Sequence, residues 1–178
     1  MSDGQAMSIA TERLELRWFV AEDATLMLRV WNDPAFVRYV GDRGIRTPAE
    51  ARAALEAGIL AMYGDMGYGP YRVALRAGDE PIGICGLFKR DYLEDPDIGF
   101  GLLPEYCRSG YAYEASRAVL DDARDRLGLA RVTAIVSPEN RASIGLIEKL
   151  GLARVEAFRP PGEDRDVLLY AVDFEGLP

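Results

Sequence analysis

One short segment of this chain has the residue types that bind an anion. The segment YCRSGYAYEA, residues 106–115, joins an arginine, a serine and a glycine directly to a helical pattern. Backbone N–H groups at the start of a helix have no acceptor within it, and the helix dipole favours negative charge at the same point. The segment therefore predicts either a phosphate-binding loop or a plain turn that ends in a helix cap, since a glycine-rich loop alone is an unspecific signal.

The strand-like segment before this loop has a second pattern with chemical meaning. In DIGFGLL, residues 97–103, alternation places Asp97, Gly99 and Gly101 on one face and large apolar side chains on the other. Glycine inside a strand often marks the close approach of a ligand or of another backbone. A ligand with a phosphate in the loop and a long arm along this strand would bring its far end toward Asp97. The alternative is that the glycines mark a bulge and that Asp97 lies on a solvated edge.

A third group of polar residues lies in SPENRASIGLIEKLG, residues 137–151. Asn140 is suited to cap the helix that follows it. Ser143 lies one turn further, where a serine hydroxyl does not favour helix formation, so the residue has either a polar task or a solvated surface position. Lys149 lies near the predicted end of the same helix, where the dipole favours a cation in any case.

Hydrophobic periodicity around these segments predicts a mixed α+β sheet. Strands are predicted over residues 11–20, 71–76, 81–88, 97–103, 131–136, 153–158 and 166–172, and helices over 21–33, 48–63, 111–127 and 141–150. A crossover helix between the fourth and fifth strands makes those two parallel, in a sheet that is otherwise mostly antiparallel. Residues 1–10 show no periodicity and are expected to form a disordered tail, and residues 11–178 are expected to form a single domain.

Composition excludes several classes of function. The net charge of -8 over 178 residues leaves no basic surface for a nucleic-acid backbone. No apolar run approaches the roughly 20 residues that span a bilayer, so no membrane partner is expected. Without a leader resembling a signal peptide, and with only Cys85 and Cys107 open to oxidation, the chain is expected in the cytoplasm, as a monomer or homodimer. The absence of histidine argues against a metal site and against Ser-His-Asp chemistry.

Two segments together, IGFGLLPEYCRSGYAYEA and SPENRASIGLIEKLGL, resemble the coenzyme-binding motifs of the GNAT superfamily of acetyl-CoA-dependent N-acetyltransferases. The segments TERLELRWFVAEDA, WNDP and EPIGICGL resemble the RimJ/RimL-type branch, which acetylates ribosomal-protein N-termini. The likeness runs from Thr11 to about Asp173. It implies a GNAT fold, in which a mostly antiparallel sheet of about seven strands is splayed between its fourth and fifth strands and flanked by about four helices.

The resemblance also implies where acetyl-CoA binds. Its pyrophosphate would contact backbone N–H groups of a loop with the family pattern Q/R-x-x-G-x-G/A, which here matches Cys107, Arg108, Ser109, Gly110, Tyr111 and Ala112. The first position departs from this pattern, because cysteine replaces glutamine or arginine. Backbone groups of Leu102 and Leu103 would pair with the pantetheine arm. Asn140 would contact the coenzyme from the opposite wall, and Lys149 would reach its phosphates.

For catalysis, the resemblance matches Asp97 to a strand position where many family members place a glutamate general base. An aspartate with a pKa of about 3.9 is a weak base toward an ammonium group, so Asp97 needs burial or a water chain, or it orients and desolvates the amine instead. The family's tyrosine acid is replaced by Ile147, and Ser143 matches the serine proposed as the acid in the ribosomal-protein branch. Its hydroxyl is a poor proton donor, and it would more readily stabilise the departing sulfur by a hydrogen bond.

The expected function is direct transfer of an acetyl group from acetyl-CoA to a primary amine, with a protein or peptide N-terminus as the first acceptor. A small-molecule amine such as a polyamine, amino acid or aminoglycoside is the alternative. Ile147 and the short Asp97 also fit an acyl-CoA-binding module without catalysis. An ATP or dinucleotide site is disfavoured, because no lysine and hydroxyl residue follow the loop and the Rossmann glycine spacing is missing.

Overall fold

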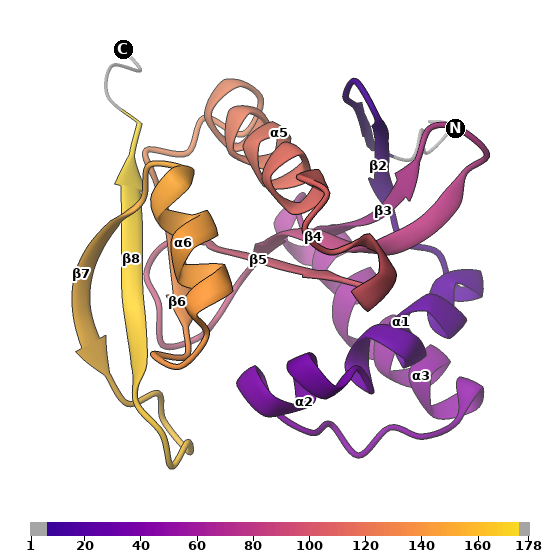
Figure 1. Cartoon of the computed structure of the whole chain (residues 1–178), viewed down its shortest axis with the longest axis horizontal. Helices are drawn as coiled ribbons and strands as arrows, with labels where there is room; N and C mark the ends of the chain where they lie inside the picture. The colour runs from indigo at the N-terminus through magenta and orange to yellow at the C-terminus, as the bar shows by residue number, and fades with distance from the viewer. Residues whose placement is uncertain (1–6, 175–178) are drawn as a thin grey trace.

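The computed structural model describes residues 7–174, whose strands form one mixed sheet of 8 strands (Figure 1). The strands are β1 (Ser8–Ala10), β2 (Leu14–Trp18), β3 (Pro70–Leu75), β4 (Glu80–Phe88), β5 (Asp97–Leu102), β6 (Arg131–Val136), β7 (Ala153–Phe158) and β8 (Val167–Asp173). Their order in the sheet is β1-β2-β3-β4-β5-β6-β8-β7, and only the β5–β6 pair among them is parallel. The predicted α+β class and the parallel central pair are therefore confirmed.

The helices flank this sheet on both faces. They are the 3-10 turns η1 (Ala21–Asp23) and η3 (Pro104–Tyr106), the π-helical segment η2 (Glu56–Leu60), and the α-helices α1 (Ala24–Trp31), α2 (Pro34–Tyr39), α3 (Pro48–Leu55), α4 (Ala61–Met66), α5 (Tyr111–Asp125) and α6 (Arg141–Lys149). Within residues 7–174, no helix is both long enough and apolar enough to cross a membrane.

Helix α2 shows how a stop signal also starts a helix. The sequence predicts that Asp33 and Pro34 end the first helix. In the structure, Oδ1 of Asp33 accepts hydrogen bonds from the N–H groups of Ala35 and Phe36, and Pro34 takes the first helical position. Both residues are favoured at these positions, so the same dipeptide that ends α1 also begins a short second helix.

Two apolar clusters cover the two faces of the sheet. One cluster lies under α5 and α6 and includes Ile98 and Ile147, and the other lies under α1 and α3 and includes Leu103. Phe100 and Leu102 pack on the first cluster, while Gly101 faces Val30 of α1, which belongs to the second cluster. The alternation predicted for this strand is confirmed, and because of it β5 contacts both apolar clusters.

The N-terminal residues differ in part from the sequence prediction. Residues 1–6 lie outside the described part of the chain. Residues Ser8–Ala10, which the sequence assigns to a disordered tail, form β1 and pair antiparallel with β2. The prediction was wrong for these residues because a three-residue edge strand is too short for its alternation to show.

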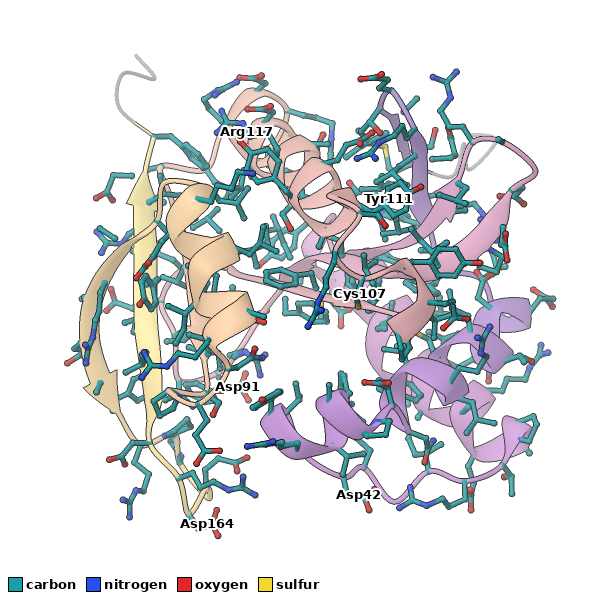
Figure 2. All side chains as sticks on the ribbon, in the orientation of Figure 1. Asp42, Asp91, Cys107, Tyr111, Arg117 and Asp164 are labelled. Carbon is teal, nitrogen blue, oxygen red and sulfur yellow. The ribbon has the colours of Figure 1, made fainter. Side chains whose placement is uncertain are left out.

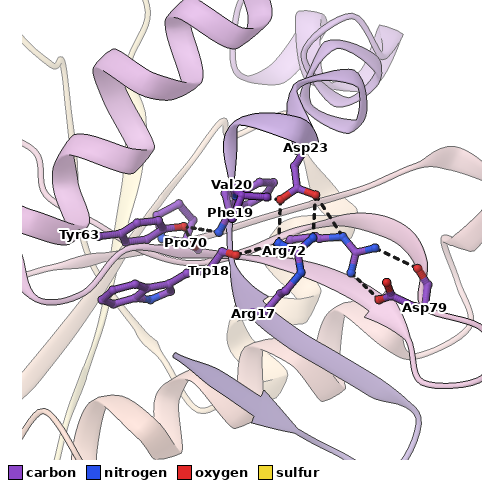
Figure 3. A network of polar contacts seen from close by, with 9 residues as sticks. All are labelled: Arg17, Trp18, Phe19, Val20, Asp23, Tyr63, Pro70, Arg72 and Asp79. Carbon is purple, nitrogen blue, oxygen red and sulfur yellow. Dashed lines mark hydrogen bonds and ion pairs between the residues drawn. The ribbon is translucent and has the colours of Figure 1, made fainter. Parts of the chain in front are cut away.

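An ion-pair network fastens the first strands to the helical layer (Figure 3). We call the residues Arg17, Asp23, Arg72 and Asp79 the Asp23 cluster. Arg17 donates to both carboxylate oxygens of Asp23 at 2.8 and 2.9 Å. Arg72, 4% exposed, lies 3.5 Å from Asp23 and donates to Asp79 at 2.7 Å. The cluster thus ties β2, η1, β3 and the turn after β3 together.

Candidate active site

Strands β5 and β6 separate immediately after they meet, in the middle of the sheet (Figure 1). The coenzyme cleft that the resemblance implies lies between them. Among the described residues, the two strands share a single register pair, Asp97 with Thr133. The N–H of Thr133 donates to the carbonyl of Pro96 at 2.9 Å. Two residues further along β6, at the next N–H that faces β5, Ile135 donates to Oδ1 of Asp97 at 3.0 Å rather than to a backbone carbonyl. The splay predicted between the fourth and fifth strands is confirmed.

The backbone of β5 presents alternate residues to this cleft. The N–H of Leu103 donates to the carbonyl of Ile82 in β4 at 2.8 Å, and its carbonyl accepts from Tyr106 at 3.0 Å. Because backbone groups alternate in direction along an antiparallel strand, those of Leu102 face the opposite side, toward the cleft. Of the two residues predicted to pair with a coenzyme, Leu102 has its backbone groups directed to the cleft, whereas those of Leu103 bond within the protein.

The loop after β5 has the features of an anion-binding cradle. Arg108 and Gly110 both have left-handed backbone conformations, with φ of 63° and 83°. None of the backbone N–H groups from Arg108 to Tyr113 has a hydrogen-bond acceptor within residues 7–174. The run begins two residues before the helix cap, so it includes more than the N–H groups that every helix start leaves free. This arrangement favours the phosphate-binding interpretation over the plain turn.

Arg13 and Glu114, which the sequence analysis did not select, hold the loop in place. The guanidinium of Arg13 donates to the carbonyl of Ser109 at 2.9 Å and to Oε2 of Glu114 at 2.7 Å, and it lies 4.5 Å from the Tyr111 ring centroid. The other oxygen of Glu114 accepts from Thr11 Oγ1 at 2.6 Å. Burial acts to raise the pKa of Glu114, but the hydrogen bonds from Thr11 and Arg13 outweigh it and hold that pKa below the usual value. The glutamate in the first turn of α5 was the available sequence signal.

An open groove of about 490 Å³ continues from the loop along α5. Its lining residues are Thr11, Glu12, Arg13, Gly110, Tyr113, Glu114, Arg117, Ala118, Asp121 and Lys149. Lys149 places its ammonium group 4.5 Å from the ring centroid of Tyr113. Figure 2 labels Arg117 on α5 and Tyr111 near the start of that helix. The structure therefore brings Lys149 and Gly110, which are far apart in the sequence, to one groove.

Helix α6 forms the other wall of the cleft. Oδ1 of Asn140 accepts from the N–H of Ser143 at 3.1 Å, so Asn140 caps the helix as its residue type predicts. Its side-chain amide N–H groups have no acceptor in the described part of the chain. Ser143 is half-buried in the first turn. Ile147 is 2% exposed and belongs to the core, so no side chain at that position reaches the cleft.

Asp97 lies at the point where the strands separate, and it is 1% exposed. Its Oδ2 accepts from Nε of Arg90 at 2.6 Å, while Oδ1 accepts from Ile135. Burial raises the pKa of Asp97 above its usual value, and Arg90 and the Ile135 N–H act against that rise. Asp97 is therefore not a solvated edge residue, and both of its oxygens already have partners.

Of the two glycines that follow Asp97 in β5, Gly99 makes room for an aromatic side chain and Gly101 does not need to. A Cβ atom on Gly99 would lie 2.9 Å from Cε2 of Phe88, and one on Gly101 would lie 3.5 Å from Val30 and 4.0 Å from Phe36. The pairing of β5 with β4 continues without a register shift, so the glycines do not mark a bulge in this pair. On this face the space above Gly99 is occupied by the protein itself.

Cys107 lies at the base of the loop, with Sγ 3.6 Å from the carbonyl oxygen of Leu103. Burial raises the pKa of this thiol, and the nearby Asp33 raises it further. A thiol with a raised pKa is mostly protonated at neutral pH, and the thiolate is the nucleophilic form. The site therefore gives Cys107 no activation as a nucleophile.

Comparison with known proteins places this site in a family. A family model described as an acetyltransferase (GNAT) domain matches residues 13–153. An uncharacterized N-acetyltransferase of Bacillus licheniformis, p20, is 30% identical over 149 residues, which cover 83% of each chain. The solved structure of an acetyltransferase from Agrobacterium tumefaciens has a TM-score of 0.80 at 25% identity, over 98% of each chain.

A third comparison concerns a coenzyme complex. The ribosomal L7/L12 alpha-N-protein acetyltransferase RimL, solved in complex with coenzyme A, has a TM-score of 0.79 at 16% identity, over 95% of this chain and 99% of its own. This likeness shows the shared fold. The family match over residues 13–153 and the relative p20 show that the chain belongs to the GNAT acetyltransferases and is an acetyl-CoA-dependent N-acetyltransferase.

Proposed function

We propose that this enzyme transfers an acetyl group from acetyl-CoA directly to the primary amine at the N-terminus of a protein or peptide. The observation that carries the coenzyme assignment is the continuity between two features. The backbone of Leu102 faces the cleft, and the run of free N–H groups from Arg108 to Tyr113 begins a few residues later. A pantetheine arm along β5 and a pyrophosphate on the loop fit these two features together.

The remaining predicted residues have roles that follow from their positions. The pyrophosphate contacts the loop from Arg108 to Ala112, and Lys149 reaches the coenzyme phosphates across the groove beside Gly110. The predicted Cys107 is not one of these backbone donors, because its N–H already donates to the carbonyl of Pro104 at 3.2 Å. Asn140 offers its free amide N–H groups from the opposite wall. These contacts are electrostatic and backbone-based, so the loop's departure from the family pattern at Cys107 does not weaken them.

The chemistry needs the amine to arrive unprotonated, to attack the thioester carbon, and to release a thiolate. We propose that the hydroxyl of Ser143, in the first turn of α6, donates a hydrogen bond to the departing sulfur. Ile147 lies in the core, so no residue at that position competes for this task. The attacking nitrogen loses one proton as the amide forms, and the thiolate takes up one proton, either that one directly or one from solvent.

The acceptor side of the cleft lies across from α6, at α2 and the following loop. Phe36 of α2 lies near Gly101, and the Arg43 guanidinium lies 5.3 Å from the Trp31 ring centroid and 5.9 Å from that of Phe36. The peptide assignment is supported by the fold shared with RimL, whose name gives a protein N-terminus as its substrate. Small amines, the alternative class of acceptor, are tested in the same transfer assay.

The experiment is a transfer assay on the purified enzyme, with acetyl-CoA and matched panels of N-terminal peptides and small amines, read by free thiol release and product mass. A melt with saturating acetyl-CoA comes first. Ligand at about 100 times its dissociation constant adds roughly 2.7 kcal/mol, which raises the melting temperature by about 5 to 10 °C in a domain of this size. Transfer to small amines but to no peptide would overturn the acceptor assignment.

Gly110→Ala has a matched control in Gly128→Ala. Both glycines have a left-handed φ, 83° and 63°, so both substitutions cost similar backbone strain. Only Gly110 lies in the loop, where the new Cβ would be 3.3 Å from the Arg13 side chain. We expect the acetyl-CoA shift to be lost in Gly110→Ala and kept in Gly128→Ala. Equal shifts in both variants would mean that the loop does not bind the coenzyme.

A further inference from the structure

Asp97 takes the place of a sheet hydrogen bond at the point where β5 and β6 part. In a continued parallel ladder, the N–H of Ile135 would donate to a backbone carbonyl of β5. It donates instead to Oδ1 of Asp97 at 3.0 Å. The carboxylate therefore ends the ladder while leaving no buried N–H without a partner, which would be costly.

The second oxygen of Asp97 fixes the orientation of this carboxylate. Nε of Arg90, seven residues earlier in the chain, donates to Oδ2 at 2.6 Å. The Asp97 side chain is 1% exposed and that of Arg90 is 35% exposed, so the pair closes the narrow end of the cleft. Arg90 and Ile135 take one acceptor position on each oxygen, and because the side chain is 1% exposed the remaining positions are closed to solvent.

We propose that Asp97 is a positioning residue that clasps β5 to β6 and sets the opening of the coenzyme cleft, and that it does not take the proton from the amine. This inference rests on the proposed function. The clasp needs an acceptor for the Ile135 N–H and a partner for Arg90, and it does not need a negative charge. A general base needs the carboxylate itself, which makes the two roles separable.

The test is an uncharged replacement of the pair, R90Q/D97N. The side-chain oxygen Oε1 of glutamine occupies the position that Nε has in arginine. The side-chain N–H of the asparagine at position 97 then donates to this oxygen, whereas in the original pair Arg90 is the donor. The asparagine oxygen still accepts from Ile135. The single variant D97N instead places two donors opposite each other, and D97A removes both hydrogen bonds. R159Q/D166N makes the same exchange in the exposed 2.8 Å pair of Arg159 and Asp166 and serves as the matched control.

We expect D97A and D97N to bind acetyl-CoA about 10- to 100-fold more weakly, since small displacements of positioning groups have effects of this size. We expect R90Q/D97N to recover acetyl-CoA affinity and transfer rate to within about 3-fold of the original enzyme. A double variant that binds acetyl-CoA normally but transfers about 100-fold or more slowly would overturn the proposal and make Asp97 the general base.

One readout is independent of the coenzyme. The amide proton of Ile135 should exchange slowly in the original protein and in R90Q/D97N, and rapidly in D97A. Protection that is unchanged in D97A would overturn the clasp even if all variants are folded. If the original protein fails to bind acetyl-CoA, the proposed function fails, while the exchange measurement still decides the clasp.

Discussion

Asp23 and Asp97 are both carboxylates that are largely out of solvent and contact arginine, but their structural roles differ. In the Asp23 cluster, the ion pairs lie beside an intact ladder, in which β2 and β3 pair over five residues from Leu14 to Trp18. At Asp97, the carboxylate stands where the ladder ends after one pair. The first site joins layers that are already paired, and the second decides where pairing stops.

This difference gives the two sites different expected phenotypes. Loss of Asp23 removes ion pairs between elements that keep their backbone hydrogen bonds, so stability falls and the cleft keeps its shape. Loss of Asp97 changes the cleft itself. The residue types alone do not separate the two cases, since both are an aspartate that contacts arginine.

The largest expected effect is on stability, in Asp23→Ala. The variant leaves Arg72, 4% exposed, without its contact to Asp23, and breaking a buried ion pair from one side is strongly destabilising. We expect the free energy of unfolding to fall by about 2–4 kcal/mol, measured by denaturant titration. Acetyl-CoA affinity should stay within about 2-fold. The exposed Asp166→Ala is the control, with an expected loss below about 1 kcal/mol. A similar loss of acetyl-CoA affinity in Asp23→Ala would contradict the difference between the two sites, because it would show that the Asp23 cluster also sets the shape of the cleft.

The glycines beside Asp97 test whether this end of β5 is filled by protein. Gly99→Ala brings a Cβ to 2.9 Å from Phe88, and we expect a loss of about 1–3 kcal/mol from overpacking. Gly101→Ala meets its nearest atom at 3.5 Å, an ordinary contact, and we expect a change within about 0.5 kcal/mol. Both are read by thermal unfolding. Equal effects would mean that Phe88 does not fill the space above Gly99.

Glu114→Gln tests a third carboxylate, the one that anchors the loop. Its pKa is lowered from the usual 4.5, so its stabilising contribution is present above that pH and is lost as pH falls through the folded-state pKa. We expect the variant to melt about 2–4 °C lower at pH 7. The difference from the original protein should close as pH falls below about 4.5. A difference in melting temperature that does not narrow at all as pH falls from 7 to 3 would show that shape rather than charge anchors the loop.

The smallest expected effect is in Arg108→Gly. Arg108 has a φ of 63°, which glycine adopts without strain, and we expect a gain of at most about 1 kcal/mol in thermal unfolding. The backbone N–H is unchanged, so the acetyl-CoA shift should remain. The control is Arg154→Gly in β7, where glycine should destabilise an extended strand. Loss of the shift in Arg108→Gly alone would show that the arginine side chain binds the coenzyme.

Local patterns predicted most of the fold. The strand over residues 153–158 and the one over 131–136 agree with the structure at both ends. The helix predicted over 48–63 is found as three consecutive segments that end at Met66, where Gly67 has a φ of 69°. The misses were α2 and β1, because both are short and their signals coincide with a stop signal or with an edge.

The candidate site was only partly predictable. The loop, Asn140 and Asp97 were selected because their residue types stand out in a local pattern. Arg13 and Arg90 were not selected, because an arginine in a segment rich in charge gives no local sign of its partner. Leu103 was paired with Leu102 by the resemblance, and only the hydrogen bond to Ile82 shows that their backbone groups face opposite sides.

The sequence by itself determined most of the order of elements and the loop that gathers free N–H groups, because each of these depends on neighbours within a few residues. The tertiary structure alone decided the role of Asp97. Its partners are 7 and 38 residues away, and the second of them is brought to it by the crossover through α5. Whether a carboxylate is a base or a clasp depends on which donors surround it, and those donors are assembled only when β6 docks beside β5.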